Sequence, residues 1–272
     1  MNHKNTLSYT IPYILWLGLF VIAPVILLIV QSFGNINGHF TLHNYVTYFS
    51  SGTYLRMTFN SIFFAFIVTA MTLLISYPMA YIMSRLKHAQ FWLLLVILPT
   101  WVNLLLKAYA FIGLFSKTGT INEFLSLIGF APHQMMFTNM SFLIVAAYIE
   151  IPFMIMPIFN SLVELDRSYI NAARDLGATQ WQTLVKVILP LSMGGVKAGI
   201  QAVFIPTLSL FMITRLIGGN RVITLGTAIE EHFLVTQNWG MGSTIGVVLI
   251  VAMILTMMLT RDRKKKGGKH GK

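Results

Sequence analysis

Long apolar stretches separated by short polar segments run along almost the whole chain. Six of them hold about 20 or more mostly apolar residues, the length at which a helix crosses the hydrocarbon core of a bilayer. They cover residues 11–33, 61–84, 91–115, 141–162, 184–213 and 241–260. A membrane β-barrel would instead show alternating segments of about 10 residues. The pattern therefore predicts an all-α polytopic membrane protein with six transmembrane helices.

The first of these stretches differs from a secretory signal. Its apolar part spans about 22 residues, which exceeds the 7–15 residues of a signal's apolar region, and no clear A-x-A cleavage site follows it. We therefore expect the stretch to be retained as a span, and residues 1–272 to form a single membrane domain.

The composition agrees with this pattern and excludes several classes of protein. Hydrophobic residues make up 56% of the 272 residues and charged residues 10%, whereas a soluble domain carries about 25% charged residues. A soluble enzyme and a disordered chain are both excluded, because neither carries so large an apolar share. The chain has no Cys, so disulfides, cysteine metal ligands and a cysteine nucleophile are excluded. The histidines lack metal-ligand spacing, and no metal site is expected.

The formal net charge of +11 is explained by topology. Thirteen of the 19 Lys and Arg residues fall on the side of the termini: Lys4, Arg85, Lys87, Arg167, Arg174, Lys186 and seven within residues 261–272. Because positive residues favour the cytoplasmic side, we expect a multi-pass protein of the cell (inner or plasma) membrane with cytoplasmic N- and C-termini. The basic tail, residues 261–272, suits anionic lipid of the bilayer. It lacks interleaved aromatic residues, so nucleic acid is not an expected partner.

The long cytoplasmic segment between the fourth and fifth stretches is predicted to be ordered. Asp166 or Ser168 can cap a helix start, and Gly177 stands where that helix would end, because glycine enters the left-handed C′ conformation cheaply. A second helix is expected to begin near Thr179, with Pro190 bending its early turns. A helix, a sharp turn and a second helix on the cytoplasmic face are typical of a docking element.

The same segment carries a motif that resembles a known family. It reads Asn171-Ala172-Ala173, three residues, Gly177, nine residues, and then Val187-Ile188-Leu189-Pro190. This resembles the pattern Glu-Ala-Ala, three residues, Gly, nine residues, Ile-x-Leu-Pro of the membrane subunits of binding-protein-dependent ABC importers. In this chain Asn replaces the Glu of the pattern, and Val replaces the Ile. The first change removes a carboxylate that could contribute to binding the ATPase, but docking itself stays possible.

The resemblance assigns a role to these residues. It implies that the segment sits in a cleft of a cytoplasmic ATPase and transmits nucleotide-driven motion. The residues so implied are Asn171, Ala172, Ala173, Arg174, Asp175, Gly177, Leu189 and Pro190.

Further matches resemble the spermidine/putrescine permeases of the PotB type within that family. They lie at residues 98–103, 107–109, 118–124, 152–157 and 172–178, and the resemblance extends from about residue 11 to 260. It implies an ABC transmembrane type-1 core over about residues 56–260 with a cytoplasmic coupling helix. It also implies polyamine substrates, a second homologous permease subunit, a cytoplasmic ABC ATPase dimer and an extracytoplasmic substrate-binding protein.

Energy for transport must come from another subunit. The chain contains no G-x-x-x-x-G-K-[ST] phosphate-binding loop, so we expect no enzymatic activity and no cofactor in this chain, with ATP and Mg²⁺ used by the ATPase. Three alternatives stay open. A permease for thiamine, sulfate or iron would differ only in its path residues. A secondary transporter would tend to show inverted repeats, and an intramembrane enzyme would need a catalytic set; neither feature is evident.

Ionisable and aromatic residues inside the spans are the candidates for the substrate path. Lys107 and Glu150 both lie roughly 12–14 Å below the outer boundary at 1.5 Å per residue, so they are placed to form an intramembrane ion pair. The alternative is that Glu150 binds an ammonium group of a passing polyamine. Because aromatic faces attract ammonium groups, four residues are further candidates, with interfacial anchoring as the alternative for each: Trp101, Tyr109, Tyr148 and Trp239.

Two G-x-x-x-G pairs predict close helix packing. They are Gly195 with Gly199 and Gly242 with Gly246. Small residues at this spacing let two helix backbones approach closely in a membrane. Both pairs are expected to serve packing and to carry no substrate chemistry.

Overall fold

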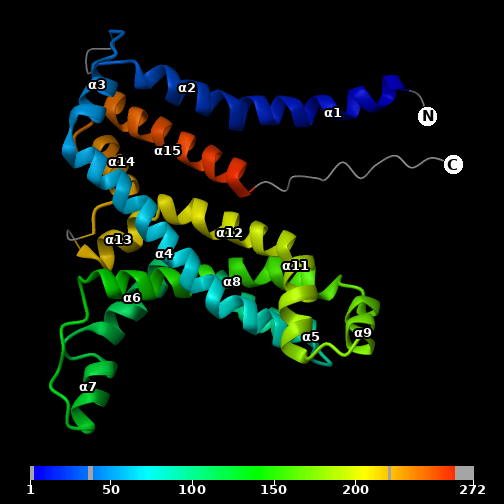
Figure 1. Cartoon of the computed structure of the whole chain (residues 1–272). Coiled ribbons are helices and arrows are strands. Elements are labelled where there is room, and N and C mark those ends of the chain that lie inside the picture. Colours follow the sequence, from blue (N-terminus) through cyan, green and yellow to red (C-terminus); the bar gives the residue numbers. More distant parts are fainter. Residues whose placement is uncertain (1–2, 36–38, 220–221, 261–272) are drawn as a thin grey trace.

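The computed structural model describes residues 3–35, 39–219 and 222–260, and these residues form helices and short connections (Figure 1). Within them the only strand-like pairing is an isolated antiparallel bridge between Gly34 and Phe40. The predicted all-α class is confirmed. The basic tail, residues 261–272, lies outside the described residues.

Four helical segments are long and apolar enough to cross a membrane. The first, Thr10–Ser32, runs through α1 (His3–Leu17), a π-helical turn η1 (Gly18–Ile22) and α2 (Ala23–Ser32). The others are α4 (Gly52–Met83), α8 (Asn139–Val163) and α15 (Trp239–Thr260). Two bent helix pairs raise the number of spans to six if each pair counts as one span.

The third predicted span is broken, so the prediction of one continuous helix over residues 91–115 is wrong. The chain forms α5 (Ala89–Ile97) and a 3-10 turn η2 (Leu98–Trp101), then turns by 89° before α6 (Leu104–Phe115) and α7 (Thr120–Leu127). The break has a local cause. Val102 is extended, and the Asn103 side chain accepts a hydrogen bond from the Leu105 backbone N–H at 2.8 Å, which starts a new helix.

The fifth predicted span, residues 184–213, is likewise divided. The chain forms α10 (Gln180–Thr183), a π-helical turn η3 (Leu184–Ile188) and α11 (Leu189–Leu191), and then bends by 64° into α12 (Met193–Leu208). A second break precedes α13 (Phe211–Leu216). Pro190 and Pro206 lie just before the two breaks, where each removes a backbone N–H from the helix ladder. The predicted bend after Pro190 is therefore confirmed, but the predicted span is too long.

The remaining elements are short and gather at the end of the bundle opposite α9. They are α3 (His43–Ser50), α14 (Leu225–Glu230) and the π-helical turn η5 (Glu231–Val235). The other end carries α9 (Arg167–Asp175), and we call it the α9 end. The start of α1 and the end of α15 both lie toward this end (Figure 1), as an even number of crossings requires.

The centre of the molecule is a three-helix core of α4, α8 and α12. α4 buries small and hydroxyl side chains against its neighbours: Ser61, Ala65, Val68, Thr69, Thr72, Ser76 and Ala80 are buried. The hydroxyls of Thr69 and Thr72 donate to the carbonyls of Ala65 and Val68 one turn earlier. Their polar atoms are thus satisfied inside the helix, and the helix backbones approach closely.

Both predicted glycine pairs lie at close helix contacts. A Cβ atom on Gly195 of α12 would come within 2.5 Å of the Pro157 carbonyl oxygen of α8, and one on Gly199 within 2.7 Å of the Met154 sulfur. A Cβ on Gly242 would touch the Phe233 ring at 3.0 Å, and one on Gly246 would touch the Leu28 side chain at 3.2 Å. The predicted packing role of these glycines is confirmed.

A second core forms where α3, α14 and α15 meet α4 and the end of α12, and α2 packs along α15 beside it. The Thr244 hydroxyl of α15 donates to the Ser32 carbonyl at the end of α2 at 3.1 Å, and the Asn44 amide donates to the same carbonyl at 3.2 Å. The Ser61 hydroxyl of α4 accepts the Leu225 N–H at 2.7 Å, which joins this core to the first.

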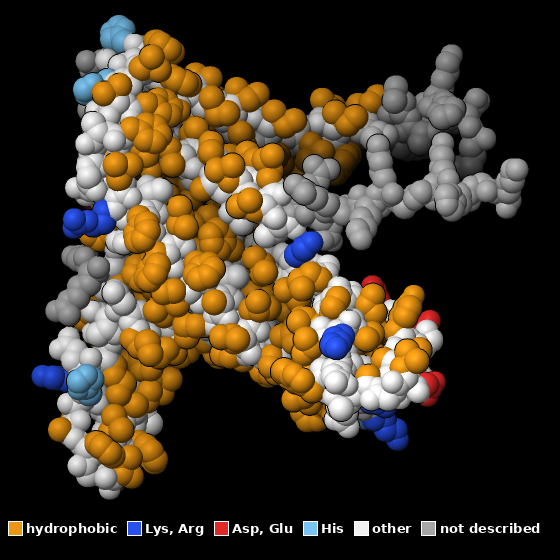
Figure 2. All heavy atoms as spheres, viewed as in Figure 1, with side chains coloured by type: hydrophobic (Ala, Val, Ile, Leu, Met, Phe, Trp, Pro, Cys, Tyr) orange, Lys and Arg blue, Asp and Glu red, His pale blue; other side chains and the backbone are white. Residues whose placement is uncertain are grey.

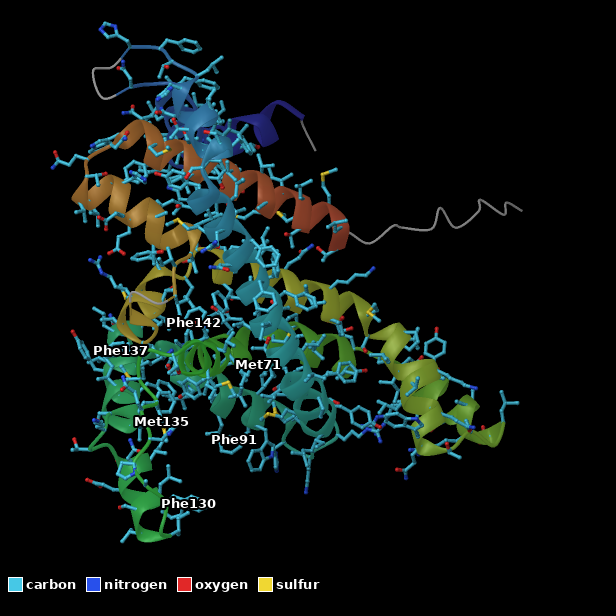
Figure 3. The ribbon with its side chains drawn as sticks, turned by 60° about the vertical axis from the view of Figure 1, so that its left-hand side comes forward. Met71, Phe91, Phe130, Met135, Phe137 and Phe142 are labelled. Carbon is cyan, nitrogen blue, oxygen red and sulfur yellow. The ribbon has the colours of Figure 1, made fainter. Side chains whose placement is uncertain are left out.

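The segment between α7 and α8 is fixed against α13. Phe137 (Figure 3) has a left-handed backbone with φ +62°, and its N–H donates to the Ile217 carbonyl at 3.0 Å. Its ring packs against Gly219, where a Cβ atom would come within 2.8 Å of the ring. The contact holds the two connections together at the end opposite α9.

Hydrophobic side chains cover the middle of the molecule in Figure 2, and most charged side chains gather toward its two ends. α1 projects from the rest of the bundle in Figure 1, and its large apolar side chains, such as Trp16, are exposed. A surface with this division suits a bilayer, in which apolar side chains face lipid.

Candidate functional site

The helix, sharp turn and second helix predicted between the fourth and fifth stretches are present as α9, the turn at Gly177 and α10. α8 ends at Val163, and the Asp166 carboxylate accepts a hydrogen bond from the Ser168 N–H at 2.9 Å to start α9. That hydrogen bond lowers the pKa of Asp166, because it stabilises the charged form. Of the two predicted caps, Asp166 is the one that the structure uses.

Gly177 ends α9 in the predicted conformation. Its φ is +80°, and its N–H donates to the Arg174 carbonyl at 2.9 Å. The Ala178 N–H donates to the Ala173 carbonyl at 3.0 Å, and Thr179 then forms a capping box with Gln182 that starts α10. Two capped helices thus meet at a sharp turn, and the turn depends on a backbone conformation that glycine adopts cheaply.

α9 projects beyond the spans at the α9 end (Figure 1), where it exposes apolar side chains. Leu176 is 89% exposed, and Tyr169 and Trp181 are also exposed. Ala172 is exposed on the same helix, with only a methyl side chain, and Ala173 is partly covered. Side chains of this kind are suited to close approach by another protein, although the free chain leaves them uncovered.

Leu189 and Pro190 lie where the predicted fifth span bends, in the half of the span nearer α9. The Ser192 hydroxyl donates to the Leu189 carbonyl at 3.2 Å and also lies 3.0 Å from the Tyr77 hydroxyl of α4. The bend is therefore tied directly to the three-helix core. The chain runs from α9 through α10, η3 and α11 directly to this hydrogen bond. A movement of α9 would therefore be passed along these short elements to the core.

Lys107 and Glu150 lie on the neighbouring helices α6 and α8, close enough to interact electrostatically. Glu150 is only 4% exposed, and Lys107 is half-buried. Both residues are described, yet their charged atoms form no ion pair within 4.0 Å. The direct ion pair predicted from sequence is thus absent from this conformation. The prediction assumed a continuous third span, and the break at residues 102–103 changes the direction of α6.

The candidate path aromatics do not form one cluster. Tyr148 of α8 packs edge-on against Phe111 of α6 with ring centroids 5.0 Å apart, and Tyr109 is exposed on the same α6. Trp101 is exposed at the break between α5 and α6. Trp239 instead packs against Phe233 at 5.7 Å, next to the second core. Tyr109, Tyr148 and Glu150 thus share the α6–α8 region, and Trp239 lies apart from them.

A pocket of about 490 Å³ at the end opposite α9, with charged and apolar residues in its lining, was not anticipated from the sequence. Arg215 of α13 and Glu230 of α14 form an ion pair across it at 2.8 Å, and the Tyr54 hydroxyl lies 2.8 Å from the His232 Nε2 atom. Burial lowers the pKa of His232, which favours the neutral ring. No spacing in the sequence signals these contacts, since Tyr54 and His232 are 178 positions apart.

Curated relatives are similar to this chain over nearly its full length. It is 35% identical over 254 residues to the spermidine/putrescine transport system permease protein PotB of Haemophilus influenzae, with 90% of this chain and 88% of the relative covered. It is also 35% identical to the protein of the same name in Escherichia coli, with 90% and 92% covered. The inner membrane ABC transporter permease protein YdcU of Escherichia coli is 29% identical over 75% of this chain and 72% of the relative. No family model matches the chain.

Solved structures show the same fold. A bacterial ABC transporter that imports the acidic polysaccharide alginate has a chain that superposes with a TM-score of 0.77 at 18% identity, covering 96% of this chain and 97% of that one. The alginate transporter in complex with a periplasmic protein bound to an alginate pentasaccharide gives a TM-score of 0.77 at 17% identity, with 94% and 93% covered. At these identities the similarity shows the fold alone.

Proposed function

Because the chain belongs to the family of spermidine/putrescine transport permeases of ABC importers, we propose that it forms half of the translocation path of an ATP-driven polyamine importer. The observation that supports a polyamine substrate is the 35% identity to the relatives of that name over 90% of this chain. The observation that supports coupling to an ATPase is α9, a capped helix that projects past the spans and exposes apolar side chains.

The proposal includes three kinds of protein partner. A second homologous permease subunit completes the path, because one bundle with so few inward polar groups makes a poor pore. An ABC ATPase dimer docks at α9 and uses ATP and Mg²⁺, while this chain binds no cofactor. A substrate-binding protein delivers the polyamine at the end opposite α9. The α9 end then faces the cytoplasm, together with both termini and the basic tail, residues 261–272.

Transport proceeds by alternating access. The outward-facing state prevails while the loaded binding protein is docked, and the inward-facing state prevails after the ATPase subunits separate. The bias comes from the different affinities of the two states for nucleotide and binding protein. The docking residues from Asn171 to Gly177 receive the motion, and Leu189 and Pro190 pass it to the core through the bend at Ser192.

Uptake of labelled spermidine in cells with and without this chain tests the proposed substrate. We expect uptake to fall to background without the chain, to return when the chain is supplied, and to be suppressed by excess unlabelled putrescine. Unchanged spermidine uptake, with loss of thiamine, sulfate or iron uptake instead, would assign the chain to another solute.

Replacing Glu150 with glutamine tests the path residue that is buried between the core helices. We expect spermidine uptake to fall about tenfold or more, because a buried carboxylate that meets an ammonium group contributes about 2–5 kcal/mol. Glu164→Gln provides the matched control, since Glu164 caps the end of the same α8 and is exposed. Normal uptake by a fully expressed Glu150→Gln protein would remove Glu150 from the path.

A further inference from the structure

A pocket of about 390 Å³ lies at the α9 end, between the ends of α4 and α8 and the inner face of α9. Its polar lining comes from Ser84, Arg85, Arg167, Asn171 and Arg174, and its apolar lining from Tyr81, Leu162, Val163, Leu165, Ile170 and Ile188. We call it the arginine pocket. Asn171 and Arg174 also belong to the proposed docking segment, but the pocket itself has no role in the function proposed above.

The arginine pocket holds three positive charges and no negative one. Arg85 comes from the connection after α4, and Arg167 and Arg174 come from the first and last turns of α9. The Arg85 guanidinium lies over the Tyr81 ring at 4.1 Å, which orients it. Among the described residues, none of the three guanidinium groups has a carboxylate within 4.0 Å.

The acidic residues near the arginine pocket in the sequence do not line it. They are Glu164, Asp166 and Asp175. Asp166 is already engaged with the Ser168 N–H at the start of α9. The lining of the pocket is therefore positively charged and contains no carboxylate, and an anion from outside would be attracted to it.

The spacing along α9 places the residues that line this pocket and the residues Tyr169, Ala172 and Leu176 on different faces of the helix. Arg167, Ile170, Asn171 and Arg174 are spaced i, i+3, i+4 and i+7, so they share one face, and all four line the pocket. Tyr169, Ala172 and Leu176 follow the same spacing on another face, and none of them lines it. Leu176, the residue after the last turn of α9, is 89% exposed. A partner that docks on the face of Tyr169, Ala172 and Leu176 thus leaves the arginine pocket to a different ligand.

The apolar side of the arginine pocket fits a lipid better than a water-soluble anion. Leu162 and Ile188 are buried in its wall, and Val163, the last residue of α8, is 51% exposed. α4 ends at Met83 and α8 at Val163, so the pocket lies where two spans leave the apolar layer. Phosphate groups of phospholipids lie at this depth, with the apolar part of the lipid on the side of the spans.

We propose that the arginine pocket binds the phosphate of an anionic phospholipid headgroup in the leaflet at the α9 end. Arginine suits this ligand, because its planar guanidinium can donate two parallel hydrogen bonds to a phosphate. The Asn171 amide adds a neutral donor at the point where a Glu would have placed a carboxylate. Basic pockets between spans at the cytoplasmic surface bind headgroups in this way. The bound lipid fixes α9 against the ends of α4 and α8.

Asn171 offers a matched pair of variants for the test. Asn171→Glu places a carboxylate among the three arginines, whereas Asn171→Gln has the same length and no charge. Asn171 is exposed, so both variants are compatible with the fold. The full chain, purified in detergent and stripped of lipid, is mixed with phosphatidylglycerol or phosphatidylcholine, and bound lipid is counted by native mass spectrometry. Inorganic phosphate, followed by the shift in melting temperature, forms a third arm.

We expect the wild type and Asn171→Gln to retain phosphatidylglycerol in preference to phosphatidylcholine. Asn171→Glu should weaken the retention of phosphatidylglycerol about fivefold, and the combined Arg85→Gln, Arg167→Gln and Arg174→Gln variant about a hundredfold, since each charge near a headgroup contributes about fivefold. Lys87→Gln is the control for general charge at the same end, because Lys87 does not line the pocket and the basic tail is unchanged in every variant. It should retain phosphatidylglycerol as the wild type does.

Three results would overturn the proposal. Equal phosphatidylglycerol retention by Asn171→Glu and Asn171→Gln would show that the arginine pocket is not the binding site. Inorganic phosphate that binds as tightly as the lipid would make a free anion the ligand. Unchanged lipid retention by the triple variant, with loss of the ATPase subunit during co-purification, would assign the arginines to a protein contact.

Discussion

Gly177→Val is expected to uncouple ATP hydrolysis from spermidine uptake in an importer that still assembles. Gly177 has φ +80°, a conformation that costs an L-residue about 1–2 kcal/mol and a β-branched one more. A Cβ atom here meets nothing within 4 Å, so the effect comes from the backbone and not from a clash. The variant should lose the hydrogen bonds that close the turn after α9, and α9 should no longer hold its angle to α10.

Gly177→Asn is the matched control for this prediction, because asparagine tolerates the left-handed conformation. Uptake and ATP hydrolysis are measured on the same membranes, together with the amount of ATPase subunit that co-purifies. We expect the Asn variant to retain most of its uptake and the Val variant to hydrolyse ATP with little uptake. Normal uptake by a correctly assembled Val variant would contradict the role assigned to the turn.

Gly195→Ala adds a single methyl group, and we expect it to destabilise the core strongly. The new Cβ atom would lie 2.5 Å from the Pro157 carbonyl oxygen and 2.6 Å from the Ser161 Cβ atom. The first of these is backbone, so α8 and α12 must move apart. Overpacking of this kind costs about 1–3 kcal/mol, and the loss should appear as a lower melting temperature and less protein in the membrane.

Gly113→Ala provides the comparison, since a Cβ atom on Gly113 of α6 meets nothing within 4 Å. Alanine is the better helix former by about 1 kcal/mol, so this variant should melt at or above the wild-type temperature. Equal melting temperatures for the two alanine variants would show that the contact between α8 and α12 is not a close one.

The spans could be predicted from the sequence, but the breaks inside two of them could not. The length of an apolar stretch locates a span whether the span is straight or bent. The helices α4, α8 and α15 therefore match their predicted stretches apart from their ends. A bend needs a different signal. Asn103 starts a new helix within an apolar run, and its capping role depends on the extended backbone of Val102, which hydropathy does not report.

The helix, turn and helix from α9 to α10 were predictable because their signals are local. Asp166, Gly177 and Thr179 each act on backbone groups within a few residues, so the sequence alone indicates a cap, a stop and a new start. The path was harder to predict, because it depends on which helices face each other across the bundle. Tyr148 packs against Phe111 of α6, whereas Trp239 packs against Phe233, next to the second core.

The arginine pocket shows how one interpretation of a residue can hide another. Arg85, Arg167 and Arg174 mark the predicted cytoplasmic side, and that reading alone accounts for their charge. The i, i+3, i+4, i+7 spacing within α9 was visible in the sequence. The spacing alone does not indicate a pocket, because the other walls come from the ends of α4 and α8. Only the fold brings these ends against that face of α9.

ATP-dependent spermidine uptake into proteoliposomes is the most direct measurement of the central claim, that this chain couples polyamine transport to a separate ATPase through α9. The purified chain is co-reconstituted with its second permease subunit, the ATPase and the binding protein. We predict that spermidine accumulates only with ATP, that the loaded binding protein raises hydrolysis, and that omission of this chain abolishes both effects. Accumulation without ATP hydrolysis, driven by an ion gradient alone, would contradict the account and identify a secondary transporter.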